Sequence, residues 1–468
     1  MKLKFFGNIY AELFTKQLDE SLLGGLRENY VSEDEPGFPK GFLRASQKHY
    51  TWWDACWTRD AGSFIRELTF RGHIDEAINC ANYLIDHVDK NAAGFYSFPR
   101  YFNRENPRGS GEEQDGTANV VMGLIELYNR LDSGDNKAKI HTFLTNEFSP
   151  VRCVLNQLKK FPLIAGSGEF GGGWSVEGLF YNVNQNFLIL SMLRLYNKYI
   201  FHENEVEAAI SDLHSNIKKH FIKNGKFVWC LDMDFREYDV SYKPNANGTS
   251  SINGISSALY DGLFDDKSEF AAEIKNTVFD LINDEDLRKH LYETYGMLTH
   301  TKKFPADHPE EYIGHVSWLA YCECYLGETA IAIGDTDMLT KAVRYIVGQT
   351  AYGGHMPRSH TEQDLRAQTN FYFSERNFSP EWEGVRNEGC GSLNLINIAQ
   401  PLHLSRVMTG LNGTLDINPT LPRGFDGFEA LGYSAIENGV LQTYDVRYEV
   451  GKPLFLRPTG AGLRRVAP

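Results

Sequence analysis

The feature that most constrains the fold is an alternation of two kinds of helical stretch along most of the chain. In the first kind, apolar residues recur at helical spacing on a single face, as in residues 73–88, 204–222 and 335–350. Such helices cover a core on one side and contact water on the other. Further candidates of this outer kind are residues 8–25 and stretches that begin near residues 137 and 267.

The second kind is apolar around more of its circumference, which is typical of a buried helix. Six stretches fit, at intervals of about 60–75 residues along the chain: 54–70, 115–131, 178–198, 251–263, 311–330 and 388–410. Six inner and six outer helices close into a double ring in which each helix hides its apolar stripe without a sheet. A superhelical solenoid competes with this ring but requires capping repeats, which we do not find. We therefore predict an all-α protein, an (α/α)6 toroid of six helical hairpins, as a catalytic domain over residues 1–410.

The connections follow a pattern of their own. Long loops rich in Gly, Pro and aromatic residues precede the inner stretches, at 89–114, 161–177, 223–250, 297–310 and 351–387. In a toroid these loops open on one face, over the N-terminal ends of the inner helices, where unpaired N–H groups and the positive end of the helix dipole lie. Loops of this length are usually functional, so we expect the functional site on this face.

The last part of the chain has a different pattern. Residues 414–422, 428–437, 441–450 and 453–458 are predicted to be short strands separated by Gly and Pro turns. We expect residues 411–468 to form a small β appendage packed on the toroid.

Composition excludes several classes of protein. The 468 residues include 47 basic and 61 acidic ones, a net charge of −14, which argues against nucleic acid or an anionic membrane as the partner. No apolar run approaches the roughly 18–20 residues of a membrane helix. The seven cysteines are scattered, which favours reduced, buried thiols over a disulfide framework. The N-terminal residues lack the apolar core of a signal peptide, so we expect a cytoplasmic location.

The sequence likewise contains no motif that indicates a cofactor. The chain has no Walker-type phosphate loop, no GxGxxG after a strand and no HExxH. We therefore expect neither a metal nor a cofactor. The sequence does not indicate an oligomeric state.

Residues 50–67 form the densest polar and aromatic segment. Three of the seven tryptophans, Trp52, Trp53 and Trp57, stand beside Arg59 and Asp60 at the start of an inner helix. Indole N–H groups need partners when buried, and aromatic rings suit the faces of sugars. We interpret the segment as a carbohydrate subsite in which rings stack and an Arg–Asp pair binds vicinal hydroxyls. The alternative is a buried ion pair packed among aromatics.

The sequence WTRDAGSF resembles the WTRDAA-type motif of glucoamylases and their relatives, the six-hairpin glycosidases. In that family the Arg–Asp pair binds the sugar at the non-reducing end. The resemblance implies that Arg59 and Asp60 bind substrate in the −1 subsite. We interpret Trp57 as a stacking wall of that site.

A second segment, residues 166–188, leads from a Gly-rich approach through Trp174 and Glu177 into an inner helix. A carboxylate beside aromatics is poorly solvated, which raises its pKa, as a general acid requires. The family places its general acid in a Trp-Glu segment at this point, which implies that Glu177 is the acid. We interpret Trp174 as a second stacking wall. The spacing departs from the adjacent Trp-Glu of the family. Glu177 as a partner of the helix dipole is the alternative, and Glu169 is a lesser candidate.

A third segment, residues 371–395, contains Glu375, Glu381, Trp382, Glu383 and Glu388 before the last inner helix. Bacterial members of the family have a Pro-Glu dipeptide here that supplies the general base. Pro380–Glu381 matches it, which implies Glu381 as the base with Glu383 second, while Arg386 is expected to pair with a carboxylate as scaffold.

Other polar residues stand where they would line a cleft on the face of the toroid where the long loops open. Glu113, Gln114 and Asp115 open the second inner helix, where Asp115 fits either sugar contact or an N-cap. The further candidates are Tyr312, His315, Trp318, His355, Arg358 and His360. The segment 411–433 resembles the closing β segment of several (α/α)6 enzymes, including the cellobiose phosphorylase and α-rhamnosidase groups.

These features together predict a glycoside hydrolase that removes a non-reducing-end sugar from an oligosaccharide or glycoside. The family implies inversion, in which an acid and a base act from opposite faces of the sugar. A phosphorylase is the first alternative. A sugar epimerase would need His bases, for which His315, His355 and His360 are candidates, and a non-catalytic carbohydrate-binding toroid is the last alternative.

Overall fold

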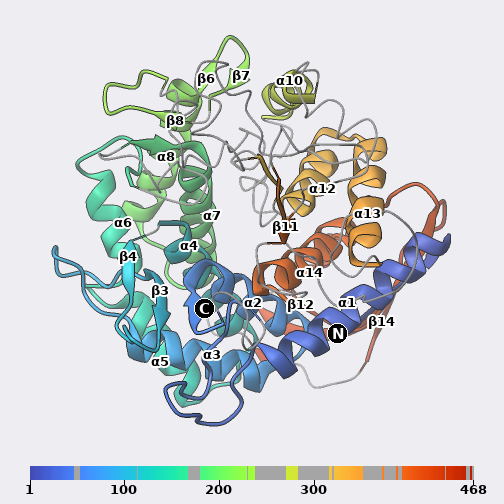
Figure 1. Cartoon of the computed structure of the whole chain (residues 1–468), viewed down its shortest axis with the longest axis horizontal. Coiled ribbons are helices and arrows are strands. Elements are labelled where there is room, and N and C mark those ends of the chain that lie inside the picture. The colour runs from blue at the N-terminus through green and yellow to red at the C-terminus, as the bar shows by residue number, and fades with distance from the viewer. Residues whose placement is uncertain are drawn as a thin grey trace.

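Helices in two shells make up most of the computed structural model (Figure 1). The structure describes residues 1–46, 53–112, 114–166, 180–228, 230–237, 270–282, 316–318, 321–351, 371–373, 386–387, 393–437, 439–459 and 464–465. Among these residues, no helix is both long enough and apolar enough to cross a membrane.

The inner shell is a ring of consecutive neighbours. Its described helices are α2 (Thr58–Arg71), α4 (Gln114–Arg130), α7 (Val183–Tyr199), α12 (Tyr321–Ile333) and α14 (Leu395–Thr409). Helix α12 packs on α14, α14 on α2, α2 on α4 and α4 on α7. Every residue of α2, α4 and α14 is buried. The toroid predicted from the sequence is thereby confirmed, although the candidate at 251–263 lies outside the described residues.

The outer shell covers this ring from outside (Figure 1). It consists of α1 (Ile9–Glu28), α3 (Ile74–His87), α5 (Asp135–Thr145), α8 (Asn204–Phe221), α10 (Ala271–Ile282) and α13 (Thr336–Ala351). Helix α8 shows the expected one-sided burial, with Val206, Leu213, Ile217 and Phe221 inside. A short helix, α6 (Pro150–Leu158), was not anticipated. Its local signal is Ser149, whose hydroxyl caps Arg152 N, followed by Pro150 in the first turn.

Short strands precede the inner helices. β2 (Ala55–Trp57), β3 (Pro99–Asn103) and β4 (Ser110–Glu112) form one ladder, which leads into α2 and α4. β5 (Tyr181–Asn182) pairs with β8 (Cys230–Leu231) before α7. β9 (Val316–Trp318), β10 (Phe371–Phe373) and β11 (Arg386–Asn387) form another ladder, and β6 (Ile222–Lys223) pairs with β7 (Lys226–Phe227). Inner helices α2, α7, α12 and α14 therefore begin several residues later than the helical pattern predicted.

A five-stranded antiparallel sheet lies at the end of the chain. Its order is β1 (Lys2–Gly7), β12 (Phe425–Glu437), β13 (Val440–Glu449) and β14 (Phe455–Pro458), with β15 (Arg464–Arg465) also on β13. The strand predicted at 414–422 does not form, because Pro419 and Pro422 cannot donate to a ladder. The N-terminal strand β1 was not anticipated in this sheet. Phe5 pairs with Phe428 across the ladder, so the sheet joins the two ends of the chain.

Candidate functional site

A buried cluster of charges lies where α2 and α4 begin. Arg59 Nε donates to Asp60 Oδ1 at 3.2 Å, and Arg59 Nη1 lies 3.7 Å from Asp115 Oδ2. Asp60 stands in the first turn of α2 and Asp115 in the first turn of α4, where the helix dipole favours negative charge. All three side chains are buried. The structure therefore brings together three of the residues that the sequence predicted for the sugar site.

A seam of glycines brings these two helices together. A Cβ at Gly116 would lie 2.2 Å from Thr58 Oγ1, and one at Gly62 would lie 2.4 Å from the backbone of Asn119. Further down, a Cβ at Gly123 would lie 2.7 Å from Gly62 O. The backbones approach so closely only because these three positions carry no side chain. The guanidinium of one helix thereby comes within ion-pair distance of the carboxylate of the other.

Hydrogen bonds fix the relative height of the two first turns. Asn119 Nδ2 donates to Asp115 O at 2.9 Å, and the Ser63 hydroxyl lies 2.9 Å from Arg59 O and 3.3 Å from Asn119 Oδ1. Thr58 Oγ1 donates to Pro99 O at 2.6 Å, which ties α2 to β3. The backbone that carries the charged cluster is therefore held from both helices and from the adjacent strand.

Burial sets the electrostatics of Asp115. It raises the pKa of this carboxyl, while Arg59 and the Gly116 N–H act in the opposite direction. The carboxyl oxygens of Asp115 can accept hydrogen bonds, as recognition of a hydroxyl requires. Arg59 meanwhile stays bound to Asp60. The cluster is thus suited to bind hydroxyl groups.

Aromatic side chains flank the cluster. Trp57 is 9% exposed, and its ring lies 5.3 Å from the ring of Tyr101 and 4.9 Å from the guanidinium carbon of Arg100. Arg59 lies 5.9 Å from the ring of Tyr321. Trp57 as a stacking wall stays a prediction, since Arg100 covers part of its ring. Arg100, Tyr101 and Tyr321 were missed by the sequence reasoning, although Arg100 and Tyr101 lie in the loop 89–114 that it marked as functional.

Most of the other predicted site residues lie outside the described part of the chain. These are Glu113, Glu169, Trp174, Glu177, Tyr312, His315, His355, Arg358, His360, Glu375, Glu381, Trp382, Glu383 and Glu388. For Trp318 and Arg386 the backbone alone is described, in β9 and β11. Their roles stay predictions.

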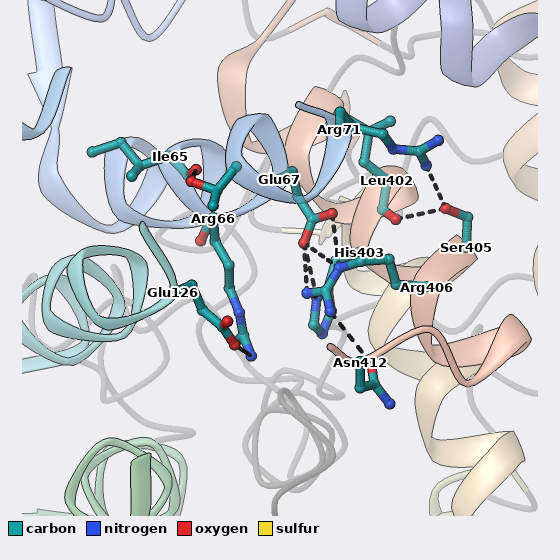
Figure 2. A network of polar contacts seen from close by, with 12 residues as sticks. Ile65, Arg66, Glu67, Arg71, Glu126, Leu402, His403, Ser405, Arg406 and Asn412 are labelled. Carbon is teal, nitrogen blue, oxygen red and sulfur yellow. Dashed lines mark hydrogen bonds and ion pairs between the residues drawn. The ribbon is translucent and has the colours of Figure 1, made fainter. Parts of the chain in front are cut away.

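A second buried charge network lies deeper in the ring. Figure 2 shows Glu67 of α2 facing His403 and Arg406 of α14, and Arg66 beside Glu126 of α4. Arg406 Nη2 donates to Glu67 Oε1 at 2.8 Å, and His403 Nδ1 lies 3.2 Å from that oxygen. Glu67 follows Asp60 by seven residues, about 10 Å along α2. The sequence reasoning missed this network because no local motif marks it.

Mutual pairing governs the charges in this network. Burial raises the pKa of Glu67, but Arg406 and His403 outweigh it and hold that pKa well below its usual range. Burial, with Arg406, lowers the pKa of His403 to about 4. These groups bind one another across α2 and α14, so we assign the network to holding the ring together. Within the described part of the chain, no cluster of His, Cys, Asp or Glu could hold a metal ion.

Known structures define the class of fold. No protein-family model matches the chain, and no curated protein matches it in sequence. A glycosidase in complex with glucose superposes with a TM-score of 0.52 at 13% identity, over 84% of this chain and 96% of that one. A mannosylglycerate hydrolase from Thermus thermophilus, also in complex with glucose, gives 0.51 at 10% identity over 83% and 100%.

The same fold occurs in another class of sugar enzyme. A D-mannose isomerase superposes with a TM-score of 0.52 at 10% identity, over 86% of this chain and 99% of that one. The chain therefore shares the (α/α)6 toroid fold of these solved structures. Hydrolases share this fold with a sugar isomerase, so the fold alone leaves the reaction open.

Proposed function

We propose that this protein is a glycoside hydrolase that removes a non-reducing-end sugar from an oligosaccharide or glycoside. The observation that carries the proposal is the buried Arg59–Asp60–Asp115 cluster at the N-terminal ends of two inner helices. The cluster offers a guanidinium and carboxyl oxygens at one end of the ring, which suits recognition of adjacent hydroxyls. Solved structures of this fold with glucose bound support a sugar as the substrate.

The proposed chemistry uses two carboxyl groups. Glu177 protonates the departing glycosidic oxygen, and Glu381 activates water on the opposite face, with Glu383 as the second candidate for the base. Inversion requires the acid and the base to stand roughly 6.5–9.5 Å apart. Glu177 precedes α7 and Glu381 precedes α14, so both segments enter inner helices, as Arg59 and Asp60 do at the start of α2. We also propose that the protein is most similar in its active-site motifs to the glucoamylases.

Hydrolysis of nitrophenyl glycosides and of oligosaccharides tests the proposal, with the anomer of the released sugar read by NMR. Asp60→Asn weakens the binding of the sugar by Arg59. We expect kcat/KM to fall about 10²-fold, since a charge-assisted hydrogen bond is lost. Glu177→Gln removes the acid and lowers kcat by about 10²–10⁴-fold. Asp75→Asn, an exposed carboxylate at the start of α3, is the control and leaves both constants unchanged.

Three results would redirect or reject the proposal. If activity requires phosphate and persists in both Glu381→Gln and Glu383→Gln, the enzyme is a phosphorylase. Interconversion of free sugars without bond cleavage indicates an epimerase or isomerase, which the D-mannose isomerase of the same fold makes the second candidate. Sugar binding without any reaction indicates a non-catalytic binding protein.

A further inference from the structure

Besides the two carboxylates, an aromatic ring contacts the guanidinium of Arg59. The ring centroid of Tyr321 lies 5.9 Å from the guanidinium carbon. Tyr321 is the first residue of α12, and Arg59 is the second residue of α2. Helix α14 packs on both of these helices and stands between them in the ring. The contact therefore links two inner helices past α14, at the N-terminal end of the ring.

Burial strengthens this contact. Tyr321 is 1% exposed and Arg59 is 6% exposed. A cation within about 6 Å of a ring centroid is attracted to the electron-rich face of the ring, and the attraction grows when water is excluded. The Tyr321 ring is itself held in place, because it packs edge-to-face against the ring of Tyr325, one turn further along α12, at 5.9 Å and 86°.

The contacts of Arg59 come from different helices. Its Nε donates to Asp60 on α2, its Nη1 lies 3.7 Å from Asp115 on α4, and its guanidinium carbon lies over the ring of Tyr321 on α12. An arginine side chain has large conformational freedom, which is lost when it binds a ligand in one orientation. A guanidinium that is already held in the binding orientation loses less of this freedom, so it binds more tightly.

We propose that Tyr321 is a positioning residue of the sugar site, whose ring holds Arg59 in the orientation in which the guanidinium binds hydroxyl groups of a sugar. This inference rests on the proposed function and deepens it, because it makes a third inner helix, α12, part of the sugar recognition. Tyr321 acts through Arg59, by the attraction between its ring and the guanidinium.

Tyr321→Leu and Tyr321→Phe test the inference in the full-length chain. Leucine removes the ring. We expect KM on the preferred nitrophenyl glycoside, and Kd for D-glucose by titration calorimetry, to rise about tenfold with kcat little changed, because Arg59 binds the sugar in the ground state and the transition state alike. Phenylalanine keeps the ring, so both constants should stay within about twofold of the wild-type values.

Fluorinated phenylalanines at position 321 separate the electrostatic role of the ring from its packing. Each added fluorine keeps the shape of the ring and weakens its attraction for a cation, so KM should rise along the series while the unfolding temperature stays constant. A series with constant KM would overturn the inference.

Arg59→Gln shows whether Tyr321 acts through Arg59. The glutamine amide carries no charge for the ring to attract, so Tyr321→Leu should raise KM no further in this background. Such non-additivity is expected of two residues in contact. A further tenfold rise in the double variant would show that Tyr321 acts independently of Arg59, and would overturn the inference.

Tyr196→Leu is the matched control. Tyr196 is also a buried tyrosine of an inner helix, but it lies in the last turn of α7. We expect this variant to lower the unfolding temperature and to leave KM and Kd unchanged.

The remaining outcomes separate this inference from the proposed function. Unchanged KM and Kd in Tyr321→Leu, or an equal loss in Tyr321→Leu and Tyr321→Phe, would overturn the inference, while cleavage by the wild type would still support the proposed function. A wild type that neither binds D-glucose nor cleaves any of the glycosides would overturn both.

Discussion

At the scale of single residues, the chain carries two buried groups of paired charges at different heights along α2. Arg59, Asp60 and Asp115 stand at the start of their helices, and Glu67, His403 and Arg406 lie deeper in the ring. The first group was predictable, because the run WTRD and the start of the second inner helix are local features. Glu67 was not, since its importance depends on which face of α2 packs against α14.

His403 provides a test of the deeper network through pH. Arg406 Nη2 lies 2.8 Å from His403 Nδ1, and His403 Nε2 lies 3.7 Å from Glu328 Oε1. Burial and Arg406 lower the pKa of His403 to about 4. In the unfolded chain a histidine titrates near 6.5.

The sign of the effect follows from proton uptake. Between about pH 6.5 and 4.5 the unfolded chain binds a proton at residue 403 and the native protein does not, so the free energy of unfolding falls as the pH falls. We expect His403→Gln to reduce this slope, as measured by urea denaturation over that range. His202→Gln, whose imidazole is exposed, is the control. An identical slope in the wild type and in His403→Gln would contradict the assignment.

At the scale of secondary structure, the close contact of α2 and α4 determines the geometry of the cluster. The helices themselves were predictable from periodicity, since burial all around or on one side leaves a clear pattern. The short ladders β2–β4 and β9–β11 were not, because strands of two to five residues carry too little pattern. Their ladder partners also lie 9 to 57 residues away in the sequence.

Gly62→Ala tests this contact. The added Cβ would lie 2.4 Å from the backbone of Asn119, and backbone cannot rotate away, so the helices must separate. We expect the free energy of unfolding to fall by about 1–3 kcal/mol, as measured by urea denaturation. Sugar turnover should fall too, because Arg59 moves away from Asp115.

Gly25→Ala is the matched control in α1. There the new Cβ would meet the tip of Ile398 at 3.0 Å, which can shift, and alanine favours a helix by up to about 1 kcal/mol. We expect this variant to be as stable as the wild type or slightly more stable. If Gly62→Ala is as well tolerated as Gly25→Ala, the seam does not control the spacing of the helices.

At the scale of the whole molecule, a ring of inner helices holds the candidate site at one end, and a sheet built from both ends of the chain completes the fold. Phe5 of β1 contacts the rings of Phe14, Phe425 and Phe428, which joins the sheet to the outer helix α1. The toroid was predictable because the repeat extends over hundreds of residues. The role of β1 was not, since its partner strand lies more than 400 residues away.

We propose that a sugar binds at the N-terminal ends of the inner helices, against Arg59 and Asp60. A crystal structure of the protein soaked in D-glucose tests this proposal. We expect a sugar ring with hydroxyl oxygens at hydrogen-bonding distance, roughly 2.6–3.2 Å, from the Asp60 carboxylate and the Arg59 guanidinium. A glucose molecule bound elsewhere on the protein, with Arg59 and Asp60 contacting no sugar, would contradict it.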